Sequence, residues 1–238
     1  MGYQFFGKIG WRHMETSFVS LISSPWQRLA FFDGLGQSVV SELLEGSKIV
    51  NTKSRQILYA QGEAAEHFGF VTAGLFRLTR INGSEQRTVL DFVGAGGLVG
   101  ILLMNKAGSR YPVNVQSIGA GQFLQIPRAT YEKYWLKNPE IVRRTQVSTM
   151  ERMEFFQWIR EIQRFSLERK VASLLLRLSS PENAELRLSR TDIADALGSS
   201  VEAVIRILSA WEKSGLVTVD QNGQEFLQID RLRQLEQT

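Results

Sequence analysis

The sequence predicts an α+β fold in three parts: an N-terminal antiparallel β-roll (a jelly roll), one long helix, and a C-terminal winged helix-turn-helix. Glycine-separated runs of β-branched and aromatic residues fill residues 48–127. Residues 139–164 are rich in helix formers and contain no glycine. Helix caps, a tight turn and a hairpin signal follow in residues 186–229. We therefore expect domains at 1–138 and 165–238, joined by the helix.

The composition is that of a globular protein. The chain has 238 residues, of which 43% are hydrophobic, enough for one large or two modest packed domains. No apolar run approaches the ~18 residues of a membrane span, and the first residues lack the long apolar core of a signal peptide. We expect a cytoplasmic protein with no membrane segment. The lack of cysteine excludes disulfides, thiolate zinc sites and cysteine-ligated iron–sulfur clusters.

Six apolar runs predict the strands of the roll, and glycines separate them. Short helices on its outside are predicted within residues 25–46, whereas residues 1–24 carry no firm pattern. Many short strands at this spacing are typical of an antiparallel barrel or jelly roll. The predicted strands are Ile57 to Ala60, Phe68 to Val71, Leu75 to Ile81, Gln86 to Phe92, Val113 to Ile118 and Gln122 to Ile126.

The long helix carries an apolar seam at three- and four-residue steps. Phe155 and Trp158 widen this face beyond a single contact, which favours dimerisation through the helix. The alternative is that the seam packs on the roll of its own chain. A further helix is predicted from Leu167 to Ser179, capped by Ser166. The seam consists of Val142, Met150, Met153, Phe156, Ile159 and Ile162, with the last four as the central dimer residues.

The helix-turn-helix is predicted from its caps. Ser189 can cap the first helix, with Asp192 three positions on, and Gly198 ends it. Ser200 can cap a second helix that runs to about Lys213. Two short strands then follow, Leu216 to Val219 and Phe226 to Ile229, joined through Asn222-Gly223, and they would form the wing. Such a unit places its second helix in the DNA major groove.

The outward residues of the second helix have the chemistry for reading bases. Glu202 can accept a hydrogen bond from cytosine N4, and Arg206, one turn later, can form a fork with guanine N7 and O6. The alternative is an ordinary surface ion pair at i, i+4 spacing. The position of the two residues inside an otherwise complete helix-turn-helix favours DNA contact.

Net charge gives no support to DNA binding. Lys and Arg number 14 against 9 Asp and Glu in residues 1–138, but 14 against 15 in residues 139–238. Phosphate contacts must therefore come from local cations, for which Arg187, Arg190, Arg206 and Lys213 are available. The residues expected at the DNA are Ser189, Arg190, Ser199, Ser200, Val201, Glu202, Ile205, Arg206 and Lys213.

The order of roll, seamed helix and winged helix-turn-helix resembles the Crp/Fnr family, that of the catabolite activator protein and the fumarate–nitrate reduction regulator. The stretches that resemble this family most specifically are residues 57–89 and 190–217. The resemblance implies a cyclic-nucleotide-binding-like roll and a homodimeric transcription regulator that binds a palindromic operator and RNA polymerase. It also implies that Glu202 and Arg206 read a half-site containing TGA. Val201 stands where the cyclic-AMP-dependent members carry a further arginine, as in the fumarate–nitrate type, and Ile205 stands where the latter type carries a serine, which leaves the outer bases open.

The expected effector pocket departs from the cyclic-nucleotide pattern. Gly100-Ile101 stands where the family's cyclic-nucleotide binders carry Gly-Glu, and Tyr111-Pro112 stands in place of Arg-Ser. Ile101 cannot accept hydrogen bonds from ribose hydroxyls, and Pro112 has no donor for a phosphate. This disfavours cyclic AMP, although a register shift of one would bring Arg110 to the phosphate position.

Other effectors stay open. Gly100 to Leu102 followed by Arg110 is similar to the 2-oxoglutarate pocket of the cyanobacterial nitrogen regulator, but Arg152 and Glu154 do not match its helix register. Haem would need His13, His67 or a methionine. A protein without any small effector fits as well. We expect no cofactor and no metal site. The pocket candidates are Gly100, Ile101, Leu102, Arg110 and Tyr111.

Two other classes of protein are alternatives to a transcription regulator. No nucleophile elbow, paired-histidine motif or phosphate-cradling Walker sequence is present, so nothing in the sequence favours an enzyme. The second rival is a small-molecule-binding module whose C-terminal domain mediates protein contacts. The near-neutral charge of residues 139–238 is the one feature that supports it.

Overall fold

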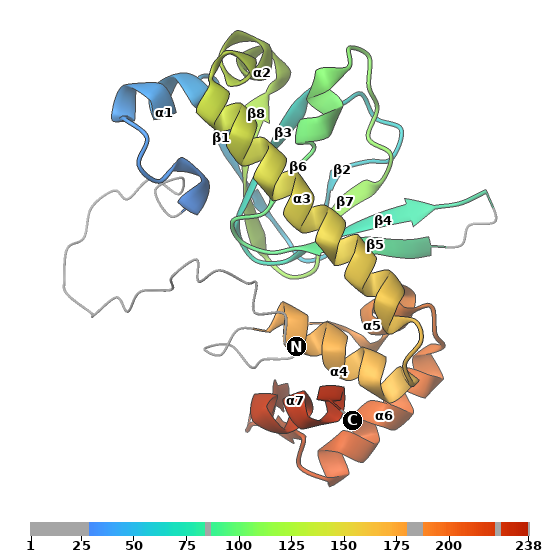
Figure 1. Ribbon diagram of the computed structural model, residues 1–238. Helices are drawn as coiled ribbons and strands as arrows, with labels where there is room; N and C mark the ends of the chain where they lie inside the picture. Colours follow the sequence, from blue (N-terminus) through green and yellow to red (C-terminus); the bar gives the residue numbers. More distant parts are fainter. Residues whose placement is uncertain (1–28, 84–86, 180–187, 222–224, 238) are drawn as a thin grey trace.

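The computed structural model describes residues 29–83, 87–179, 188–221 and 225–237. The β-roll forms one end of the molecule, a small helical domain forms the other, and the long helix α3 crosses the face of the roll to reach the helical domain (Figure 1). The predicted α+β fold of roll, long helix and winged helix-turn-helix is confirmed. No helix in these ranges is long and apolar enough to cross a bilayer.

The roll consists of two four-stranded antiparallel sheets. Their strand orders are β1-β8-β3-β6 and β2-β7-β4-β5. Each of the six predicted runs contains a strand, while β1 and the two-residue β6 were not predicted. Strands β3, β4 and β8 each bury four consecutive residues, so both faces of these strands are covered. The strands are β1 (Lys48–Thr52), β2 (Ile57–Tyr59), β3 (His67–Ala73), β4 (Phe76–Ile81), β5 (Arg87–Val93), β6 (Leu98–Val99), β7 (Asn114–Ser117) and β8 (Gly121–Pro127).

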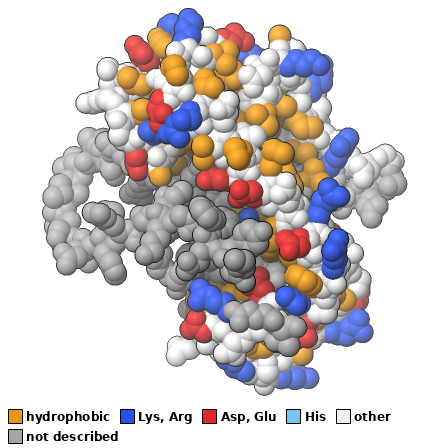
Figure 2. Space-filling model, in the orientation of Figure 1, with side chains coloured by type: hydrophobic (Ala, Val, Ile, Leu, Met, Phe, Trp, Pro, Cys, Tyr) orange, Lys and Arg blue, Asp and Glu red, His pale blue; other side chains and the backbone are white. Residues whose placement is uncertain are grey.

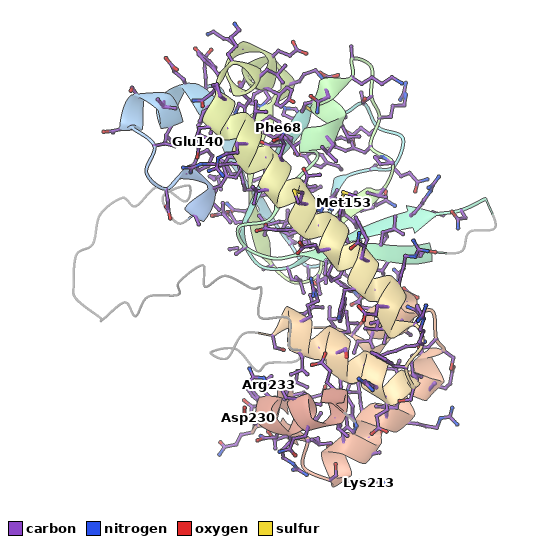
Figure 3. All side chains as sticks on the ribbon, viewed as in Figure 1. Phe68, Glu140, Met153, Lys213, Asp230 and Arg233 are labelled. Carbon is purple, nitrogen blue, oxygen red and sulfur yellow. The ribbon has the colours of Figure 1, made fainter. Side chains whose placement is uncertain are left out.

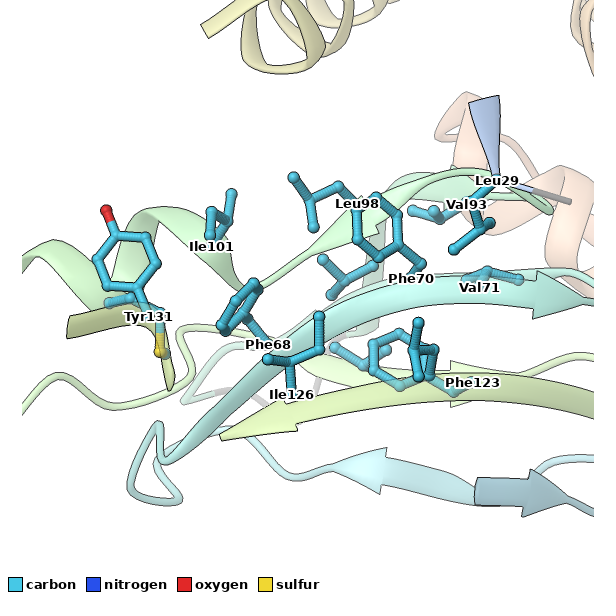
Figure 4. Close-up of a cluster of buried hydrophobic side chains, with 14 of the residues drawn as sticks. Leu29, Phe68, Phe70, Val71, Val93, Leu98, Ile101, Phe123, Ile126 and Tyr131 are labelled. Atoms are coloured by element: carbon cyan, nitrogen blue, oxygen red, sulfur yellow. The ribbon is translucent and has the colours of Figure 1, made fainter. Parts of the chain in front are cut away.

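The core of the roll is aromatic. Phe68 and Phe70 on β3 are fully buried; Phe68 lies near Ile101 and Tyr131, and Phe70 lies near Leu98 (Figure 4). Trp135 closes one end of this core and donates its ring N–H to the Leu43 carbonyl at 2.9 Å. Short helical turns surround the core; the first two lie in the predicted 25–46 segment, of which residues 25–28 fall outside the described ranges. They are η2 (Ala30–Phe32), α1 (Gln37–Leu43), η3 (Ile101–Asn105), α2 (Arg128–Lys133) and η4 (Trp135–Lys137).

The long helix α3 spans Pro139–Ile162. Asn138 caps it: its side-chain oxygen accepts from the backbone N–H of Glu140 at 3.1 Å and of Ile141 at 3.3 Å. Pro139 fits at the first helical position, where no N–H partner is needed. The helix ends two residues before the predicted residue 164, in a turn that leads to the next helix.

The C-terminal domain contains the predicted two-helix unit and one helix that the sequence pattern did not reveal. The second wing strand was predicted to reach Ile229, which is wrong, because Ile229 begins the helix α7 and the buried Leu232 packs it on α4. The predicted turn Asn222-Gly223 lies outside the described residues. The elements are α4 (Leu167–Leu178), α5 (Arg190–Leu197), α6 (Val201–Lys213), β9 (Val217–Val219), β10 (Glu225–Leu227) and α7 (Ile229–Gln237).

The roll and the C-terminal domain share a hydrophobic core. Val89 and Phe92 of β5 are buried in the same cluster as Ile193 of α5 and Trp211 of α6. The β4–β5 side of the roll therefore packs directly against the first helix of the helix-turn-helix, which fixes the two domains relative to each other.

Candidate functional site

The turn between α5 and α6 has the geometry of a helix-turn-helix. Ser189 and Asp192 form a reciprocal capping box, in which the Asp192 N–H donates to the Ser189 hydroxyl at 3.1 Å and the Ser189 N–H to the Asp192 carboxylate at 3.3 Å. Gly198 ends α5 in the left-handed conformation (φ +62°), which glycine adopts without strain. Ser200 caps α6 by accepting from the Ala203 N–H at 3.2 Å. The predicted caps are confirmed.

Helix α6 is held on the domain by one apolar face. Val204, Leu208 and Trp211 are buried at helical spacing. The Trp211 ring N–H donates to the Glu168 carboxylate of α4 at 2.8 Å. The opposite face of α6 is consequently fixed in orientation and points away from the domain.

The outward face of α6 carries the predicted base-reading residues. Glu202 and Arg206 are exposed, and Ile205 between them is 46% exposed. Within the described part of the chain, neither Glu202 nor Arg206 forms an ion pair or a side-chain hydrogen bond. Val201 at the start of the helix is half-buried. The surface ion pair that was the alternative interpretation is therefore not formed, and both polar ends are available to a ligand.

The predicted DNA-contacting residues outside α6 differ in whether their side chains already have partners within the protein. Ser189 donates its hydroxyl to Asp192 at 2.7 Å, and Arg190 is ion-paired with Glu225 of the wing strand β10. The Ser199 hydroxyl is buried and finds no partner among the described residues. Arg190 is thus held by Glu225 in this structure, and its phosphate contact stays a prediction.

Lys213 is separate from the other predicted contacts. It is the last residue of α6 and lies at the far tip of the domain (Figure 3). At 1.5 Å per residue it is about 16 Å along the axis from Glu202. Arg187, predicted as a further cation, lies outside the described residues.

Two ion pairs join the roll to α5. Arg77 of β4 pairs with Asp192 where both side chains are buried, and Arg87 of β5 pairs with Asp195, its Nε donating to Oδ2 at 2.8 Å. Arg77 also donates from Nε and Nη2 to the Gln116 side chain at 3.0 and 2.8 Å. Sequence reasoning missed both pairs, because residues more than one hundred positions apart give no local signal. The one hint was an arginine inside the apolar run 75–81.

A pocket lies between the roll and α3. It contains about 780 Å³ of space, including the part that opens to solvent. Four of the five predicted pocket residues line it: Gly100, Ile101, Leu102 and Tyr111. Arg110 does not, because its Nη1 donates to the Gly62 carbonyl at 2.7 Å on the outside of the roll. The predicted role of Arg110 in the pocket is therefore wrong.

Arg152 of α3 is the charged group of this pocket. Its Nη2 donates to Asp91 Oδ2 at 2.6 Å and its Nη1 to the Leu98 carbonyl at 3.0 Å. Burial raises the pKa of the Asp91 carboxyl, and Arg152 counteracts this shift. The sequence indicated Arg152 as a residue near the pocket but gave no sign of its pairing with Asp91, which lies on β5 and belongs to no motif.

Two predicted lining residues have structural tasks. Gly100 takes the left-handed conformation (φ +83°) that turns the chain from β6 into η3. Tyr111 stacks on Tyr59 and donates its hydroxyl to the His67 carbonyl at 2.5 Å. Burial raises the pKa of Tyr111 to about 12, so the phenol is neutral at physiological pH.

The predicted dimer residues fall into two groups. Met153 (56% exposed) and Phe156 (42% exposed) belong to a row of hydrophobic side chains along the exposed side of α3, together with Val147 and Met150 (Figures 2 and 3). Ile162 is only 2% exposed and packs in the C-terminal core of its own chain, and half-buried Ile159 packs against the same core. Ile162 is therefore excluded as a dimer contact, and the exposed row lies nearer the middle of the helix.

No metal-binding cluster is found in the described ranges, where no three His, Asp or Glu side chains come together in a suitable way. His67 lies half-buried on β3, and burial lowers its pKa. His13, the other histidine considered for haem, lies outside these ranges.

A pocket-bearing roll joined by a long helix to a winged helix-turn-helix defines a class of protein, the two-domain DNA-binding transcription regulators. The family model for the cyclic nucleotide-binding domain matches residues 49–138. The model for the Crp-like helix-turn-helix domain matches residues 169–238. The chain belongs to the Crp/Fnr family of transcription regulators.

The chain is similar to bacterial regulators over most of its length. The nitrogen fixation regulation protein FixK of Bradyrhizobium diazoefficiens is 27% identical over 195 residues, 78% of this chain and 81% of the relative. The transcriptional activator protein Anr of Pseudomonas aeruginosa is 22% identical over 189 residues, 76% of each chain. These relatives are regulators and not enzymes, in line with the absence of enzyme motifs from the sequence.

Solved structures share the fold. FixK2 from Bradyrhizobium japonicum matches with a TM-score of 0.69 at 22% identity, over 80% of this chain and 97% of that one. The c-di-GMP-responsive regulator CLP of Xanthomonas campestris matches with a TM-score of 0.66 at 18% identity, over 81% of this chain and 99% of that one.

Proposed function

We propose that this regulator acts as a homodimer on a palindromic operator whose half-sites contain TGA. The observation that carries the proposal is the exposed pair Glu202 and Arg206, one turn apart at the start of α6 and without a partner among the described residues. The N-terminal part of a helix in the major groove contacts base edges. The free carboxylate and guanidinium stand at this end.

The chemistry of the two side chains supports the core of the half-site. Arg206 can donate two parallel hydrogen bonds to guanine O6 and N7, and Glu202 can accept from cytosine N4 on the opposite strand. Ile205 can contact a thymine methyl group but cannot form a hydrogen bond. The bases flanking the core are therefore read weakly.

Dimerisation through α3 would give the two-fold symmetry. The exposed row that includes Met150, Met153 and Phe156 needs an apolar cover. A second copy of α3 would provide it and would set two α6 helices about 34 Å apart, one turn of DNA. Contact with RNA polymerase in the cytoplasm, as the family resemblance implies, belongs to the same proposal.

A small effector that is not cyclic AMP would bind in the pocket between the roll and α3. Ile101 and Pro112 line it where the family's nucleotide binders have polar residues. Arg152 and Met153 of α3 line the same pocket. A ligand there would contact both the roll and the helix that leads to the DNA-binding domain.

Operator binding by Arg206→Ala tests the proposal. Fluorescence anisotropy should give specific binding to a duplex with two TGA half-sites, and Arg206→Ala should weaken it by about 1–3 kcal/mol per half-site. Lys106→Ala is the matched control, since it removes one exposed cation from the roll and should leave the affinity unchanged. Equal affinity of Arg206→Ala and the control would contradict the proposal.

A further inference from the structure

The pocket between the roll and α3 is lined almost entirely by hydrocarbon. The roll contributes side chains such as Leu78, Leu98 and Val113, and α3 contributes Met153 and Phe156. A ligand in this pocket would gain most of its affinity from burying apolar surface.

The charges of the pocket cancel. Among the described residues, Arg152 is the only charged side chain that lines it, and Arg152 is paired with the buried Asp91 at 2.6 Å. An anionic ligand would therefore meet a neutral pair. Burying its charge without net compensation is costly.

Few hydrogen-bonding groups remain for a ligand. Thr149 donates its hydroxyl to the Thr145 carbonyl at 2.8 Å, and Tyr111 donates to His67. Ser148 lines the pocket and has no hydrogen-bond partner in the described ranges, and the Arg152 guanidinium has N–H groups beyond its two bonds. The lining thus offers one or two donors in an apolar wall.

We propose that this pocket binds an uncharged, largely apolar small molecule that carries a single hydrogen-bond acceptor directed at Ser148 and Arg152. The inference rests on the proposed function in taking this pocket as the effector site. It goes further by naming the class of ligand, which differs from the anionic nucleotides that the domain's family name suggests.

Binding of the neutral fluorophore N-phenyl-1-naphthylamine to the full chain tests the inference. We expect its fluorescence to rise on binding and cyclic AMP to leave the signal unchanged. Ser148→Trp should fill the pocket and Leu103→Glu should place a charge in its wall, so each should weaken probe binding at least about tenfold. Leu136→Glu changes an exposed leucine outside the pocket and should bind the probe normally.

Two outcomes would overturn the inference. One is displacement of the probe by cyclic AMP, which would show an anion site. The other is equal probe binding by the wild type and both pocket variants, which would place the probe outside the pocket. Operator binding by each variant is measured in parallel. Failure of the wild type to bind the probe, with intact operator binding, refutes only the ligand class, whereas absence of operator binding in the wild type refutes the proposed function.

Discussion

Arg77 on β4 and Asp192 on α5 form an ion pair that is buried between the roll and the helix-turn-helix. The same Asp192 carboxylate accepts from the hydroxyl and the N–H of Ser189 in the capping box. The Asp192 side chain therefore helps to cap the first helix of the DNA-binding unit and also fixes this helix to the roll. The orientation of α6, which packs on α5, depends on that contact.

Breaking this pair should destabilise the protein. Arg77→Met leaves the Asp192 carboxylate buried without its partner, and we expect a loss of about 3–5 kcal/mol in the free energy of unfolding. Urea denaturation measures it. The control is Lys133→Met, which breaks the exposed pair with Glu45 and should cost far less, because solvent screens exposed charges. Equal losses for the two variants would show that burial of the Arg77 pair has no energetic weight.

Release of Arg190 should increase the electrostatic part of DNA binding. Glu225→Gln removes the partner of Arg190 beside the N-terminus of α5. One further phosphate contact steepens the dependence of log Kobs on log salt concentration by about 0.9. Anisotropy at several salt concentrations measures the slope. The control Asp230→Asn frees Arg233 on α7 instead and should leave the slope unchanged. An equal change of slope in both variants would show that Arg190 does not contact DNA phosphates.

Charge on the exposed row of α3 should produce monomers. Met150→Glu with Phe156→Glu places two carboxylates where a second helix would pack, and we expect sedimentation to give the mass of one chain. Leu136→Glu, an exposed leucine on η4, should stay dimeric. A dimer that persists in the double variant would show that the interface lies elsewhere.

The Glu140 carboxyl should titrate unusually low. Hydrogen bonds from Arg143, at 2.9 and 2.7 Å, and from Arg144, at 2.6 Å, lower its pKa from 4.5 to about 2. A folded-state pKa below the unfolded value contributes stability that is complete above about pH 4.5 and is lost as the pH falls towards 2. Glu140→Gln should remove this part of the acid dependence. Carboxyl NMR shifts measure the pKa, and a midpoint near 4.5 would show that the ion pairs do not form in solution.

Local signals predicted most of the fold. Caps such as Ser166, Ser189 and Ser200 act on backbone groups within four residues, so they are visible in the sequence. Helix α7 was missed because its apolar start follows directly on the wing strand and resembles its continuation.

The sequence predicted only those parts of the candidate site whose residues are close together along the chain. Glu202 and Arg206 share one helical turn, and the structure exposes both. Asp91 with Arg152, and Arg110 with Gly62, are brought together by the fold of the roll from positions about 50 to 60 residues apart. No spacing in the sequence encodes such contacts, and the interpretation of Arg110 as a pocket residue failed for this reason.

The most direct measurement of the central claim is selection of bound DNA from a random pool by the wild-type protein and by Arg206→Ala. The account predicts that the wild type enriches two-fold symmetric sequences with TGA in each half, and that Arg206→Ala loses the preference for guanine in this core. Enrichment of asymmetric sequences, or the same core from both proteins, would contradict it.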